Sequence, residues 1–312
     1  MQDTRQLFLL ITLLLLALTR GATADDTVAA LSRSSRLPAY LLELPDSVSD
    51  ILIADVASAT MRRFVRSGGN IVEKDQRYMS IGLNGTGKER AWDRKTPLGV
   101  YFITEKLDTS KLNDKYGAAA FSLDYPNARD RQKHRTGSGI WLHGVDQKNP
   151  DRPPRDTDGC LVLPNEEILL LAEVIELLVT PVIVAREIVW ATPDELETTR
   201  QEFRRMLDIW KNSLARGDLE IYLSLYSDDF QYREMDKDEW SSYRLGVFEA
   251  RPLEGVRIDD VMLLADPEET NLFLSRFTQV LLTHAGPVTT TKRLYWRHDE
   301  GGDWQIVSED TG

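Results

Sequence analysis

Two short stretches of this sequence carry side chains that could perform covalent chemistry. Cys160 is the only cysteine of the chain, and His143 is one of its four histidines. A thiol needs a base to become a nucleophile near neutral pH, since the pKa of a free cysteine is about 8.5, and imidazole is the usual base. Glycines follow His143 and precede Cys160, which lets backbone amides and a substrate approach closely. We predict that Cys160 is a nucleophile and His143 its base, although sequence spacing alone does not place them in contact.

Two arginines, Arg152 and Arg155, lie in the polar loop between the two stretches. A guanidinium group can bind a carboxylate through two parallel hydrogen bonds, so these side chains are candidates for recognising a substrate carboxylate. The alternative is that both are solvated and pair with aspartates of the same loop. The other histidines lack partners at metal-ligand spacing, and the glycines of 82–87 do not have the Walker spacing. We expect no metal ion and no cofactor.

Composition sets the class of protein. The chain has 312 residues, which allows two domains, and 42% hydrophobic with 28% charged residues is typical of a globular fold. The net charge of -12 argues against a nucleic-acid partner, because such proteins usually present a basic face.

The N-terminus has the pattern of a secretory signal peptide over residues 1–24. Arg5 precedes an apolar run at 7–18, and Ala22-Thr23-Ala24 offers a cleavage site. The run is too short to span a bilayer, so we expect no membrane span in the mature chain; an uncleaved anchor is the alternative. Export to the periplasm or cell envelope makes a lone cysteine unusual, since exported proteins tend to pair their cysteines. Cys160 is then either reactive or a buried, inert thiol.

The elements that must position these residues are mostly strands. Branched and apolar runs predict strands at 51–55, 60–65, 78–82, within 96–103, at 140–142 and at 182–184. The predicted strand at 140–142 leads directly into His143. Residues 37–42 read as a short helix or a pairing arm, and 111–135 as a long irregular segment that covers a cleft. After Cys160, Asn165 is a predicted N-cap for a helix over 166–179.

The second half of the chain predicts a separate domain over residues 193–312. Thr192 and Glu195 form a capping box with Pro193 at the first helical position, and Gly217 stops the helix. A short helix at 219–226 follows, and then strands at 230–233, 256–264, 272–282, 289–296 and 304–307. Helices followed by a run of strands indicate an α+β domain with a curved sheet wrapped on a helix.

The motifs resemble one known family. His143-Gly144, a spacer and Gly159-Cys160 resemble the signature of YkuD-type L,D-transpeptidases. An upstream element of the same family is similar to Lys88 followed by Asp93-Arg94-Lys95-Thr96-Pro97-Leu98-Gly99-Val100-Tyr101. Residues 193–312 resemble an NTF2-like domain, a pairing similar to the peptidoglycan L,D-carboxypeptidases that set cell shape. The resemblance implies a β-rich YkuD-like catalytic domain at 51–186, after an N-terminal segment at 25–50, and a C-terminal NTF2-like domain.

The resemblance also implies roles for individual residues. Cys160 would attack the amide between diaminopimelate and the terminal D-alanine of a tetrapeptide stem, with His143 as the base. The carbonyl of Gly144 would orient the imidazole, and the amides of Asp158, Gly159 and Cys160 would form the oxyanion hole. Tyr101 and Trp141 join Arg152 and Arg155 as expected substrate contacts.

Two departures from the family pattern bear on the acyl acceptor. Asp158 stands where the family often has His or Ser, and this anion should raise the pKa of the thiol unless an arginine neutralises it. Val162 stands where many relatives have arginine. The leading expectation is an L,D-transpeptidase acting on peptidoglycan stem peptides, with an L,D-carboxypeptidase as the alternative. A non-catalytic cell-wall-binding protein is the alternative of another class, and a homodimer is possible.

Overall fold

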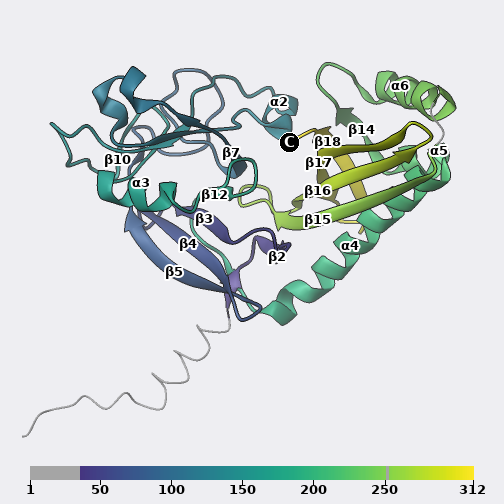
Figure 1. Ribbon diagram of the computed structural model, residues 1–312, viewed down its shortest axis with the longest axis horizontal. Helices are drawn as coiled ribbons and strands as arrows, with labels where there is room; N and C mark the ends of the chain where they lie inside the picture. The colour runs from purple at the N-terminus through teal and green to yellow at the C-terminus, as the bar shows by residue number, and fades with distance from the viewer. Residues whose placement is uncertain (1–35, 251–252) are drawn as a thin grey trace, which may run out of the picture. The chain divides into compact units, whose positions relative to one another are not determined.

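The computed structural model describes residues 36–250 and 253–312 (Figure 1). The predicted signal peptide, and the predicted N-terminal segment up to residue 35, lie outside the described residues. None of the described helices is long and apolar enough to cross a membrane. Strands dominate and helices are few, which confirms the predicted α+β class.

The first half of the chain forms an eight-stranded mixed sheet. Its spatial order is β11 (Leu161–Val162), β9 (Trp141–His143), β8 (Ala120–Leu123), β7 (Gly99–Leu107), β12 (Pro181–Ala185), β3 (Asp50–Asp55), β4 (Thr60–Ser67) and β5 (Asn70–Tyr78). A small parallel sheet pairs β6 (Ile81–Gly82) with β10 (Arg155–Thr157). The short helices of this half are η1 (Thr109–Lys111), η2 (Asp114–Tyr116), α2 (Ala128–Gln132) and α3 (Asn165–Ala172).

The central strands of this sheet contribute side chains to two hydrophobic cores, one on each face. Every residue of β3 and β12 is buried, and the alternation of side chains sends neighbours to opposite faces. Leu52 packs with Leu142 and Ile168 in one core, whereas Ile53 packs with Met262 and Leu274 of the second half in the other. The second of these cores therefore contains residues of both halves of the described chain.

The second half forms a six-stranded sheet with helices packed on it. Its spatial order is β14 (Tyr226–Gln231), β18 (Trp304–Asp310), β17 (Gly286–His298), β16 (Leu272–Thr283), β15 (Gly255–Ala265) and β2 (Leu41–Glu43). Helix α4 (Pro193–Arg216) runs along this sheet, with α5 (Leu219–Ser224) and α6 (Lys237–Ala250) beyond it (Figure 1). Phe203 and Trp210 of α4 are fully buried against Phe277 and Trp296 of the sheet.

The segment predicted as a helix or a pairing arm is a pairing arm. β1 (Leu37–Pro38) pairs antiparallel with β13 (Trp190–Ala191), and β2 pairs antiparallel with β15 at the edge of the six-stranded sheet. The chain before the catalytic motifs thus completes the sheet of the second half.

Several boundary predictions were wrong. The helix expected over 166–179 spans only Asn165–Ala172, and the segment 111–135 is less irregular than predicted because it contains β8 and α2. The polar strand β5 and the helix α6 were not predicted. Both bury few residues, since only Arg77 is buried in β5 and only Trp240 in α6, so neither shows a clear apolar period.

Candidate functional site

The pairing of β9 with β11 sets the geometry of the site. The two strands are parallel neighbours, with Leu161 opposite Leu142 and Val162 opposite His143. Cys160 directly precedes β11, so the same register puts it beside Trp141. Alternate residues of a strand share a face of the sheet, and therefore Cys160, Trp141 and His143 lie on one face.

The imidazole of His143 is held by its own backbone neighbour. Nδ1 lies 2.7 Å from the carbonyl oxygen of Gly144, as the family resemblance implied. A carbonyl oxygen only accepts, so Nδ1 carries the proton and Nε2 keeps a free lone pair. Burial lowers the pKa of His143 to about 4, an effect that the Gly144 carbonyl opposes and the positive charge of Arg152 reinforces. The ring is therefore neutral at pH 7.

The thiol of Cys160 is also uncharged at rest. Burial raises its pKa, and the nearby Asp158 carboxylate adds to this effect; the backbone N–H of Trp141 and the positive charge of Lys115 act in the opposite direction. Sγ lies 3.5 Å from the carbonyl oxygen of Gly139, to which the thiol donates. The pair is a neutral thiol and a neutral imidazole rather than a stored ion pair, so the proton must move as the sulfur attacks.

Two threonines fix the turn over residues 157–160, which we call the nucleophile turn. Thr157 Oγ1 donates to the carbonyl of Cys160 at 2.8 Å and accepts the amide of Gly159 at 3.0 Å. Thr96 Oγ1 donates to the carbonyl of Gly159 and accepts the amide of Gly82, both at 2.9 Å. Gly159 has a φ of 127°, and a Cβ there would lie 2.7 Å from the carbonyl oxygen of Lys95. The two sequence motifs therefore join through direct backbone contacts.

One of the three amides predicted for the oxyanion hole, that of Gly159, is already hydrogen-bonded within the nucleophile turn. The amide of Gly159 already donates to Thr157 Oγ1, so it cannot also donate to a developing oxyanion in this conformation. The amides of Asp158 and Cys160 remain the predicted donors.

Asn165 has a role that sequence reasoning missed. It is the first residue of α3 rather than its cap, and the N-cap position is Pro164, which makes no side-chain cap bond. Its side chain accepts the amide of Ala118 and donates to the carbonyl of Val145, both at 2.9 Å. Asn165 thereby fixes the loop that follows His143, where a Cβ on Gly144 would lie 2.2 Å from Asn165 Oδ1.

The two predicted carboxylate-binding arginines occupy different surroundings. Arg152 is half-buried; its Nη1 donates to the backbone carbonyl of Asp156 at 2.9 Å, and its positive charge acts on His143. It lines an open groove of about 700 Å³ together with Tyr78, Val145 and Asn165. Arg155 lies exposed in β10. Of the two, Arg152 is the arginine that the structure brings to the histidine.

Tyr101 is not part of the substrate surface, contrary to expectation. It is fully buried, and its hydroxyl donates to the carbonyl of Leu98 at 2.9 Å. A side chain without solvent exposure cannot contact a substrate in this conformation, so Tyr101 belongs to the core. Trp141, in contrast, is half-buried and lies on the face that carries His143.

An aromatic residue that the sequence did not single out completes this face. The ring of Tyr116, at the end of η2, lies 4.6 Å from that of Trp141 and 5.1 Å from that of His143, measured between centroids. Lys115 lies over the Tyr116 ring at 4.9 Å. The only sequence signal for these two residues was their place in the segment predicted to cover a cleft.

Asp158 has an arginine as its cationic partner, and this arginine lies outside the loop that carries Arg152 and Arg155. Its carboxylate lies 3.4 Å from Nε of Arg94, and both side chains are exposed. Arg94 belongs to the upstream motif, whose Lys88 is buried and pairs with Asp93 at 2.7 Å.

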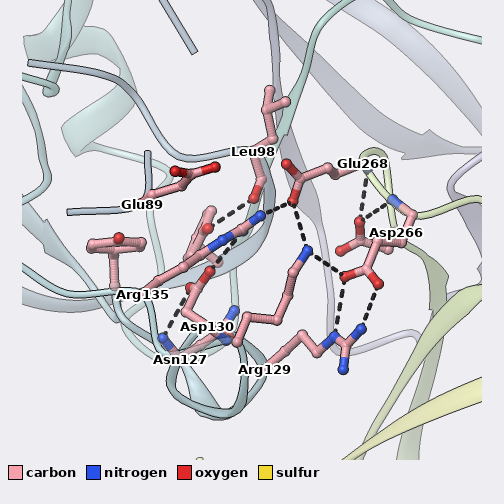
Figure 2. Close-up of polar contacts among 12 residues, drawn as sticks. Glu89, Leu98, Asn127, Arg129, Asp130, Arg135, Asp266 and Glu268 are labelled. Carbon is pink, nitrogen blue, oxygen red and sulfur yellow. Dashed lines mark hydrogen bonds and ion pairs between the residues drawn. The ribbon is translucent and has the colours of Figure 1, made fainter. Parts of the chain in front are cut away.

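The segment that leads to β9 is held by ion pairs with the second half of the chain. Arg135 pairs with Asp130 at 3.1 Å and with Glu268 at 2.6 Å (Figure 2). Lys133 pairs with Glu269 at 3.1 Å. Glu268 and Glu269 lie in the turn between β15 and β16. This turn therefore contacts the stretch that continues into Gly139, the hydrogen-bond acceptor of the thiol.

Each half of the chain matches a known domain family. Residues 49–184 match the L,D-transpeptidase catalytic domain family, YkuD, and residues 202–310 match the Cds6 C-terminal NTF2-like domain. No curated protein sequence matches the chain.

Two solved structures are similar over both halves. Bdellovibrio bacteriovorus Bd1075 is 25% identical with a TM-score of 0.72, covering 89% of this chain and 99% of its own. The helical cell shape determining protein Pgp2 from Campylobacter jejuni is 24% identical with a TM-score of 0.73, covering 90% of this chain and 97% of its own. The likeness to Pgp2 establishes a shared fold.

Proposed function

Because the chain combines a YkuD-type L,D-transpeptidase catalytic domain with a Cds6-type NTF2-like domain, we propose that it cleaves peptidoglycan stem peptides through a cysteine acyl-enzyme. The bond attacked is the amide between diaminopimelate and the terminal D-alanine of a tetrapeptide. The observation that carries this proposal is the hydrogen bond from His143 Nδ1 to Gly144, on the sheet face shared with Cys160.

The chemistry follows from the protonation states. Nε2 of the neutral His143 accepts the thiol proton as Sγ bonds to the substrate carbonyl carbon. The imidazolium then gives this proton to the nitrogen of D-alanine, the C–N bond breaks, and a thioester remains on Cys160. The amides of Asp158 and Cys160 stabilise the tetrahedral oxyanion. An acceptor attacks the thioester, and the thiol is restored.

The leading proposal for the acceptor is the amine of a second stem peptide, which makes the protein an L,D-transpeptidase. Hydrolysis to a tripeptide is the second candidate, because the similar Pgp2 is described as a cell-shape determining protein and trimming of stems would alter the wall. Either reaction places the protein in the periplasm or cell envelope, where peptidoglycan lies.

Purified protein incubated with disaccharide-tetrapeptide, with products read by mass spectrometry, tests the proposal. A crosslinked dimer supports transfer, whereas tripeptide and free D-alanine alone support hydrolysis. Cys160→Ala and His143→Ala should each abolish both products, and Val189→Ala, which removes an exposed side chain after β12, is the matched control. A Cys160→Ala protein as active as the parent would overturn the acyl-enzyme, and a parent protein that forms neither product would favour a non-catalytic, wall-binding role.

A further inference from the structure

The upstream motif forms a tightly hydrogen-bonded loop beside the nucleophile turn. The carboxylate of Asp93 accepts the backbone amides of Glu89, Arg90 and Lys95 at 2.9, 3.0 and 3.1 Å. It also pairs with Lys88, and these contacts hold the pKa of Asp93 below its usual range even though burial opposes the shift. A single carboxylate thus fixes the backbone of residues 88–96, which we call the Asp93 loop.

Trp92 lies on this rigid loop and has almost no protein contact. Its side chain is 93% exposed, whereas all the other tryptophans of the chain are buried or half-buried. An exposed indole leaves a large apolar surface in water. The hydrogen bonds to Asp93 hold the backbone of the loop in place, so the loop cannot move to bury the indole of Trp92.

The backbone at this position is also unfavourable for a bulky residue. Trp92 has a φ of 66° and Arg94 a φ of 56°, both in the left-handed region that glycine or asparagine adopts more readily. A bulky residue held there by the surrounding structure is a recurrent feature of ligand contacts. The strained backbone and the exposed ring are independent observations on the same residue.

The Asp93 loop lies directly against the nucleophile turn. The carbonyl oxygen of Lys95 would be 2.7 Å from a Cβ on Gly159, and Arg94 pairs with Asp158 at 3.4 Å. On its other side, the amide of Ala91 donates to Thr136 Oγ1 at 3.2 Å. Trp92 therefore stands two residues from Arg94, at the margin of the site that carries Cys160.

We propose that Trp92 is a binding platform for a sugar ring of the glycan strand to which the stem peptide is attached. This inference rests on the proposed function, because it takes peptidoglycan as the substrate. An amino-sugar ring has an apolar C–H face that stacks on a flat indole, while its hydroxyl and acetamido groups stay in water. Such a partner suits a ring that is exposed on a rigid loop and cannot be buried in a deep pocket.

The charged neighbours of Trp92 fit the same ligand. Arg90 and Arg94 are exposed on either side of it in the sequence. Guanidinium groups donate hydrogen bonds to carbonyl oxygens such as that of an acetamido group. The platform would favour substrates that carry the sugar over free peptides of the same sequence.

The test is the ratio of kcat/KM for disaccharide-tetrapeptide to that for the free tetrapeptide. Because aromatic stacking is worth about 0.5–1.5 kcal/mol, Trp92→Ala should lower this ratio about two- to tenfold. The loss should come from a higher KM for the sugar-bearing substrate. Trp92→Phe, which keeps an aromatic face, should retain most of it. Tyr243→Ala, which removes an exposed aromatic ring of α6, is the matched control and should leave the ratio unchanged.

A second measurement separates this inference from the proposed reaction. Cys160→Ala protein is sedimented with glycan strands stripped of their peptides, and Trp92→Ala in that background should reduce the bound fraction. A parent enzyme that processes neither peptide substrate would refute the proposed function, and the sedimentation would still decide the role of Trp92. An unchanged kcat/KM ratio together with unchanged sedimentation would overturn the sugar platform.

Discussion

Thr96 and Gly159 are 63 residues apart in the sequence and are joined by a hydrogen bond of 2.9 Å from Thr96 Oγ1 to the Gly159 carbonyl oxygen. The same hydroxyl accepts the amide of Gly82, and Thr96 is fully buried. One side-chain oxygen thus fixes the carbonyl that precedes the nucleophile.

Replacing this hydroxyl by a methyl group should affect both stability and turnover. Thr96→Val leaves the Gly82 amide and the Gly159 carbonyl without their partner, which should lower the free energy of unfolding by about 1–3 kcal/mol. The nucleophile turn should also lose its position, so kcat should fall more than KM rises. Urea denaturation and steady-state kinetics measure the two effects. Thr96→Ser should preserve both, and a Val variant with parental kcat would contradict the positioning role.

The pH dependence of stability should report the buried histidine. The pKa of His143 is lowered to about 4, so between pH 6.5 and 4 the unfolded chain binds a proton that the folded chain does not. The free energy of unfolding should therefore fall as the pH falls through this window, by an amount on the order of 3 kcal/mol. Below pH 4 this contribution stays constant, since both states are protonated. His143→Gln should remove this part of the profile, measured by denaturation at each pH; a profile identical to the parental one would contradict a neutral buried ring.

The alkylation of Cys160 should reveal the charge of its neighbour. Burial and Asp158 both raise the pKa of the thiol, so its reaction with iodoacetamide should be slow at pH 7 and should still be rising at pH 9. Asp158→Asn should speed the reaction at pH 7, whereas Arg94→Ala should slow it. Each change should stay below about fivefold, because solvent screens this exposed pair. If both variants were alkylated at the parental rate, the Asp158 carboxylate would have no effect on the sulfur of Cys160.

The ion pairs of Figure 2 should couple the second half of the chain to the site. Glu268→Gln leaves Arg135, whose side chain is only 9% exposed, with Asp130 as its remaining partner. We expect a loss of about 1–3 kcal/mol of stability, less than for a buried cation left without any partner. Alkylation of Cys160 should change as well, because the Arg135 segment continues into Gly139. Asp228→Asn, which breaks the exposed pair with Lys237, should change neither the stability nor the alkylation rate. If Glu268→Gln were alkylated at the parental rate, the ion pairs of Arg135 would have only a structural role.

Local signals in the sequence predicted local structure well. The capping box of Thr192 and Glu195 and the stop at Gly217 mark the bounds of α4 because a cap depends only on residues within one turn. The hydrogen bond from His143 to the next carbonyl is equally local, and it followed from the family resemblance.

Contacts between distant segments could not be predicted in this way. Asn165 has the sequence context of a cap, but in the structure its side chain bonds to Ala118 and Val145, and no propensity encodes that choice. Tyr101 lies in a motif beside the site and is nevertheless buried, because a hydrophobic core covers each face of β7 at residues 99–103. The occupied amide of Gly159 likewise depends on a side-chain rotamer of Thr157.

The pairing arm has a practical consequence for dividing this protein. The two family matches begin at residues 49 and 202, so fragments cut at those limits would both lack β2. The edge of β15 would then expose unpaired backbone amides and carbonyls together with the apolar surface that Leu41 and Leu42 cover. Open strand edges pair with other chains, so the isolated second domain should aggregate unless residues 37–43 are supplied with it, whether fused or as a separate peptide.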